Sequence, residues 1–146
     1  MVDFSQLSNQ DVNATSVARY TIHEIMTGDV SPTLILRPAT EVNAAYFNAL
    51  LKRSQKNSRV VQARAANVQL LEESRGEDKK LYPQHVIVGW ENVYDADGKE
   101  IKFSKKVCEE FLAALPDWIF SNVTAFAGNP ANFVDGMMDT ESVAKN

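Results

Sequence analysis

The chain has 146 residues, 45% of them hydrophobic, and a formal net charge of -4. This length suits one core of ordinary size, and the acidic balance lacks the positive field of a general nucleic-acid binder. The one cysteine, Cys108, excludes an intramolecular disulfide and a multi-cysteine zinc site and favours a reducing cytoplasm. The sequence predicts neither a signal peptide nor a membrane span, since it shows no long apolar run.

The amino-terminal residues 1–17 predict a flexible arm. Residues 5–16 are rich in Ser, Asn and Gln, and their isolated apolar residues, Leu7 and Val12, offer too little surface to offset the entropy of ordering. We expect a single domain over residues 18–138 and a frayed polar tail over residues 139–146.

Two short runs with β-branched and aromatic residues follow the arm, at residues 19–26 and 33–37. Between them stand Thr27-Gly28-Asp29 and Ser31-Pro32, which are turn-forming sequences. The two runs therefore predict strands joined as a hairpin.

A helical pattern starts after Thr40, with apolar residues at three- and four-residue steps and Glu41 in the first turn. The apolar pattern weakens across residues 54–58 and returns over residues 60–71, which predicts two helices or one bent helix. Residues 72–80 are charged and contain Gly76, so we expect a loop there.

A second hairpin is expected further along the chain. Residues 84–95 favour an extended, partly buried strand in which Gly89 marks a bulge. Asp95-Ala96-Asp97-Gly98 predicts the turn, and Ile101 and Phe103 supply the return strand.

Three short helical segments are predicted at the carboxyl end. Ser104 is placed to cap the first, Pro116 ends it, and Asp117 starts the second. Gly128-Asn129-Pro130 separates a third segment that contains Phe133. Together these elements predict an α+β fold, with a small antiparallel sheet from two hairpins and helices packed on one face.

The polar residues that could bind a metal ion are better explained by structural roles. If Asp97 took the fifth position of a calcium loop, the first would be Val93 and the twelfth Ser104, so a plain turn is preferred. His23 and His85 lack further ligands at metal-binding spacing, which favours structural or surface histidines.

Catalytic signatures are also missing from the sequence. Cys108 lies on the apolar side of its predicted helix, which favours a buried, inert thiol. The sequence has no nucleophile elbow, no phosphate-binding glycine loop and no zinc-protease helix signature. We therefore expect a protein that is not an enzyme and uses no cofactor and no metal.

The strongest charge feature is a basic stripe between residues 42 and 71, a range without Asp or Glu. It is read as a solvated helix face, a surface for an acidic protein partner, or a phosphate-binding surface without interleaved aromatics. Trp90 and Trp118 either fill the core or anchor an interface. The candidate partner-binding residues are Lys52, Arg53, Lys56, Arg59, Arg64, Trp90, Trp118 and Phe133.

The region over residues 19–134 resembles small tail-assembly proteins of tailed bacteriophages. The likeness rests on residues 32–33, Asn43-Ala44-Ala45-Tyr46-Phe47-Asn48, Val88-Gly89-Trp90-Glu91-Asn92-Val93, Asp95-Ala96-Asp97-Gly98-Lys99-Glu100-Ile101, Phe103-Ser104, Leu115-Pro116, Ala127, Asn129 and Asn132-Phe133. The resemblance implies a tail assembly chaperone without cofactor or covalent chemistry. Such a chaperone binds the tape-measure protein in the host cell cytoplasm, keeps its hydrophobic helices from aggregating and helps recruit tail-tube subunits.

Two other functions stay open at this point. The polar arm and tail could order against neighbouring subunits of a virion tail or neck, which would make the protein a structural component of the particle. The basic stripe leaves a small nucleic-acid-binding regulator as the remaining alternative, although nucleic acid is the least favoured partner. Homo-oligomerisation is compatible with all three.

Overall fold

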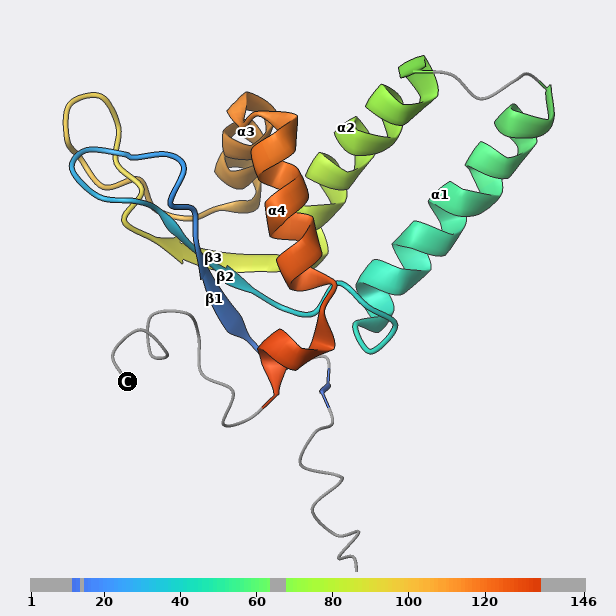
Figure 1. Ribbon diagram of the computed structural model, residues 1–146, viewed down its shortest axis with the longest axis horizontal. Coiled ribbons are helices and arrows are strands. Elements are labelled where there is room, and N and C mark those ends of the chain that lie inside the picture. The colour runs from blue at the N-terminus through green and yellow to red at the C-terminus, as the bar shows by residue number, and fades with distance from the viewer. Residues whose placement is uncertain (1–11, 14, 64–67, 135–146) are drawn as a thin grey trace, which may run out of the picture.

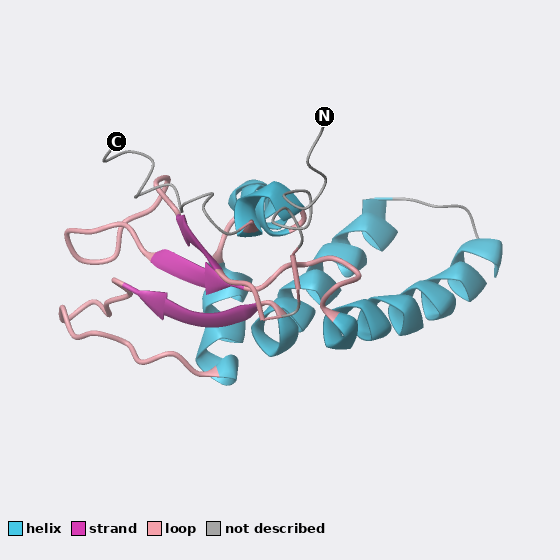
Figure 2. Cartoon of the chain, turned by 90° about the horizontal axis from the view of Figure 1, so that it is seen from below, coloured by secondary structure: helices cyan, strands magenta, loops and turns pink. Residues whose placement is uncertain are grey.

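The computed structural model describes residues 12–13, 15–63 and 68–134, with the side chains of these residues outside 55–75. Within these ranges it is an α+β fold with a three-stranded antiparallel sheet, four α-helices and a short 3-10 helix, which confirms the predicted fold class. Two of the helices project to one side of the sheet, as both views show (Figure 1, Figure 2). The predicted arm, apart from residues 12–13 and 15–17, and the predicted tail lie outside the described residues.

The sheet has the order β1-β2-β3, with β1 at Ala18–Thr21, β2 at Thr33–Leu36 and β3 at Ile87–Glu91. The first predicted hairpin is confirmed, because β1 and β2 pair antiparallel. β3 pairs antiparallel with the other edge of β2, and the register shifts beside Gly89. This irregularity is the bulge that the glycine predicts.

The second hairpin differs from the prediction. The turn forms, with Gly98 at φ 78°, but the return segment makes a single bridge between Tyr94 and Glu100 instead of a strand. Residues 101–103 alone separate this bridge from the cap of the next helix, which leaves no length for a ladder. The carbonyl of Ile101 instead accepts the indole N–H of Trp90 at 2.8 Å.

The central region forms two helices, α1 at Ala44–Ala63 and α2 at Val68–His85. The prediction of a loop over residues 72–80 is wrong, since these residues are helical. Glu, Arg and Lys are good helix formers, and the single Gly76 costs only about 1 kcal/mol. Packing of the following turns of α2, where Tyr82 is buried, offsets that cost. The predicted strand consequently starts at Ile87 rather than at residue 84.

The carboxyl-terminal helices follow the prediction closely. α3 spans Lys105–Ala114, and the Ser104 hydroxyl accepts the backbone N–H of Val107 at 3.1 Å as its cap. α4 spans Asp117–Ala127 directly after Pro116. The 3-10 helix η2 covers Pro130–Phe133.

The core lies between the sheet and the helices. Tyr20, Leu34 and Trp90 share one row of the sheet, and Tyr20 meets Phe126 of α4 with ring centroids 4.9 Å apart. Phe120 of α4 is buried against Tyr82 of α2. None of the helices in the described ranges is both long and apolar enough to span a bilayer.

Candidate partner-binding site

The feature that best suits partner binding is the pair formed by α1 and α2, which we call the helical arm (Figure 1). Its base is fixed by the buried side chain of Asn43. The amide Nδ2 of Asn43 donates to the carbonyl of Pro38 at 3.0 Å and to the carbonyl of His85 at 2.8 Å. Its Oδ1 accepts the backbone N–H of Tyr46 at 3.4 Å. One side chain thus joins the start of α1 to the end of α2.

Further along the arm, aromatic and charged contacts hold the two helices together. The rings of Tyr46 and Tyr82 meet edge to face, with centroids 5.8 Å apart. Burial raises the pKa of both phenols above the ordinary value, which keeps them neutral. Arg53 of α1 pairs with Asp78 of α2, and its Nε lies 3.5 Å from Oε2 of Glu77. The Arg53 side chain is only 17% exposed, so it serves as an interhelical tie.

A second tie fastens α2 to the corner between α3 and α4. Lys79 Nζ donates to the Leu115 carbonyl at 2.7 Å and lies 2.8 Å from Oδ1 of Asp117. The same ammonium group stands 5.8 Å from the centre of the Phe120 ring. The proximal part of the helical arm is therefore held from two sides.

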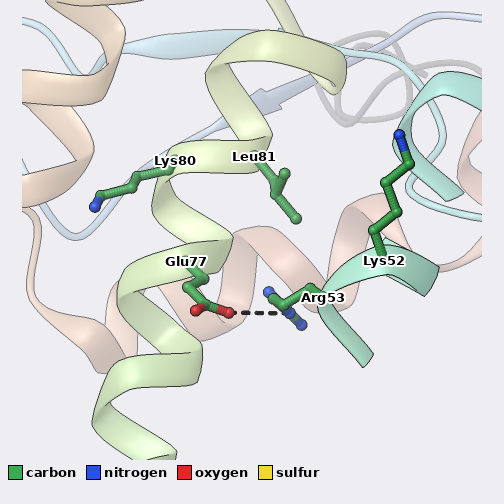
Figure 3. A pocket seen from close by; sticks show the side chains of 5 residues that line it. All are labelled: Lys52, Arg53, Glu77, Lys80 and Leu81. Carbon is green, nitrogen blue, oxygen red and sulfur yellow. Dashed lines mark ion pairs between the residues drawn. The ribbon is translucent and has the colours of Figure 1, made fainter. Parts of the chain in front are cut away.

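Between the two helices lies an open groove of about 310 Å³ (Figure 3). We call it the arm groove, and the described residues that line it are Lys52, Arg53, Glu77, Lys80 and Leu81. Lys52 and Lys80 are exposed, and among the described residues no carboxylate lies within ion-pair distance of either ammonium group. The groove thus combines an apolar side chain, an internally neutralised arginine and two available lysines.

The structure divides the sequence-predicted site residues among different places. Lys52 and Arg53 line the arm groove, and Trp118 at the start of α4 is 62% exposed. Trp90 is 8% exposed, packs edge to face on Phe103, and lies in the core, as does Phe133. The side chains of Lys56 and Arg59, and all of Arg64, lie outside the described residues.

Sequence reasoning missed the α2 half of the groove because it expected a loop there. Glu77 and Leu81 stand four residues apart, the spacing that places side chains on one helix face. That spacing, with strong helix formers around it, was the available signal. The basic stripe on α1 likewise gave no sign that Arg53 is matched by acidic residues of α2.

The other residues considered for chemistry have structural surroundings. Oδ1 of Asp95 accepts the backbone N–H groups of Asp97 and Lys99, each at 2.9 Å, which organises the predicted turn. His23 is exposed. The described residues include no group of three or more His, Cys, Asp or Glu that could hold a metal ion.

Cys108 is fully buried, and burial raises the pKa of its thiol to about 12. We expect native protein at pH 8 to react with a disulfide reagent such as dithionitrobenzoate at least about 100-fold more slowly than unfolded protein. In the native state little of the thiol is ionised, and the reagent cannot reach the buried sulfur. Release of thionitrobenzoate, followed with and without guanidinium, measures this. The pKa of the Cys108 thiol is higher in the folded state than in the unfolded state. Above the unfolded-state pKa the unfolded chain therefore loses the thiol proton first, and the free energy of unfolding should fall as pH rises. Equal rates in both states would contradict the buried assignment.

Comparison with known families gives one match. The model of the family described as YdaY prophage protein matches residues 42–146, more than two thirds of the chain. The chain belongs to the YdaY prophage protein family. The YdaY match begins just before α1 and includes the helical arm, β3, α3 and α4. Searches of curated proteins and of solved structures found no match.

Membership in the YdaY family confirms the bacteriophage origin that the resemblance implied. The tail-assembly role goes beyond that membership and stays a prediction.

Proposed function

We propose that this YdaY-family protein is a phage tail assembly chaperone, which binds the tape-measure protein in the host cytoplasm and assists tail-tube assembly without catalysis. The observation that carries the proposal is the helical arm, a helix pair that projects from the sheet and holds an open groove (Figure 1). The phage origin and the sequence resemblance to tail-assembly proteins point in the same direction.

A projecting helix pair suits the handling of another helix. Amphipathic helices bind by laying their apolar face into a groove between helices, and charged groups at the rim set specificity. The tape-measure protein of the resembled family has long hydrophobic helices that aggregate when uncovered. The arm supplies a surface of this kind, and its base is fixed to the domain by Asn43 and Lys79.

The surroundings of Arg53 favour a protein partner over nucleic acid. Glu77 and Asp78 neutralise this arginine, so its positive charge is not available to a phosphate backbone. The nucleic-acid regulator is therefore the weaker proposal.

Co-expression with the tape-measure protein encoded in the same prophage tests the function. We expect the tape-measure protein to become soluble and to copurify with this chain, and the tape-measure protein expressed alone serves as the control. Failure of the intact chain to copurify or solubilise it would contradict the proposal. Mass spectrometry of purified particles provides a second reading, because stoichiometric presence in virions would favour a structural component of tail or neck.

A further inference from the structure

We infer that the arm groove is the docking site for an amphipathic helix whose apolar face is flanked by acidic side chains. The inference rests on the proposed function and specifies which surface receives the partner segment and what chemistry that segment carries. It is drawn from the charge, the shape and the packing of the groove.

The charge of the groove favours a partner helix with acidic side chains along its edges. Lys52 projects from α1 and Lys80 from α2, and the ammonium group of Lys80 points away from α1 in this view (Figure 3). Arg53 is already matched by Glu77 and Asp78. Within the described part of the lining, the two lysines therefore carry the positive charge that remains for a ligand. Carboxylates on the two flanks of a partner helix would meet them.

The shape of the groove selects an apolar helix face. Leu81 and the aliphatic stems of the lysines provide apolar surface at its centre. On α1, Ala45 and Ala49 precede Lys52 at four- and three-residue steps, which places them on the same side of the helix. Such small side chains let a third helix approach closely, so that the partner would complete a three-helix packing with the arm.

The same composition disfavours a phosphate ligand. The Arg53–Glu77 pair of the lining offers a phosphate no net positive charge, whereas an amphipathic helix can place its apolar residues over this pair. The lysines then contact the partner at the rim, where exchange of their charge changes binding without disturbing the core.

The test uses the full chain and two synthetic helical peptides of identical apolar sequence, one flanked by glutamate and one by lysine, each labelled for fluorescence anisotropy. We expect the glutamate-flanked peptide to bind at least about tenfold tighter than its lysine-flanked counterpart. The double variant K52E/K80E should lose at least about tenfold in affinity for the first peptide and gain affinity for the second.

A matched control carries the same change of charge elsewhere. Lys99 and Lys102 are exposed and lie between β3 and α3, so K99E/K102E should leave both affinities within about twofold. Circular dichroism checks that all variants keep their helices. Equal binding of the two peptides, or an unchanged affinity of K52E/K80E, would overturn the docking site. A dimer of the free chain that K52E/K80E converts to monomer would also overturn it, because the occupant would then be a second copy.

The outcome separates the docking site from the proposed function. If the intact chain copurifies with the tape-measure protein and K52E/K80E does so equally well, the docking site fails while the chaperone function stands. If the intact chain does not bind the tape-measure protein but shows the expected peptide preference and charge reversal, the chaperone function fails while the docking site stands.

Discussion

Replacing Phe120 by alanine is expected to lower the free energy of unfolding by about 3–5 kcal/mol. Phe120 is 1% exposed, and its ring meets the ring of Tyr82 with centroids 5.3 Å apart. The ammonium group of Lys79 stands beside the same ring. Alanine would leave a cavity where α4 packs on the helical arm. Urea denaturation followed by far-ultraviolet circular dichroism measures the change.

A conservative variant at the same position gives the comparison. Phe120→Leu keeps most of the buried volume, so its cost should stay near about 1.5 kcal/mol. If Phe120→Ala cost less than Phe120→Leu, or under about 1 kcal/mol, the ring would not occupy a packed core site. An unchanged denaturant slope would show that the variants alter stability rather than the compactness of the denatured state.

Replacing Asn43 by alanine is expected to destabilise the protein by about 2–3 kcal/mol. The amide of Asn43 donates hydrogen bonds to the carbonyls of Pro38 and His85. Alanine would leave these two acceptors without that donor. Asn43→Asp should cost more, because it replaces the donating group with an oxygen that faces the same two carbonyls. The same urea titration measures both variants, and hydrogen exchange should show earlier opening at the start of α1.

The control for this prediction is an exposed asparagine on α1. Asn48 is exposed on α1, and Asn48→Ala should change stability by no more than about 0.5 kcal/mol, in the stabilising direction if helix propensity dominates. Similar costs for Asn43→Ala and Asn48→Ala would show that the buried hydrogen bonds of Asn43 do not hold the base of the arm.

Local signals in the sequence predicted much of the fold. Ser104 caps α3, Pro116 separates α3 from α4, and Gly98 takes the positive φ of the turn, all as the residue types suggest. The first hairpin followed in the same way from its β-branched runs and turn residues. These features depend on a few neighbouring residues, so the chain specifies them without reference to the rest of the fold.

The sequence alone also identified the basic residues of α1, but the tertiary structure decided what each of them does. Arg53 became an interhelical tie because helical residues 77 and 78 bring carboxylates to it, whereas Lys52 remained available at the groove. Trp90 and Trp118 look equivalent in sequence, yet one is buried in the sheet and the other exposed on α4. Charge pairing and burial depend on contacts between residues far apart in the chain, and only the packed fold determines those contacts.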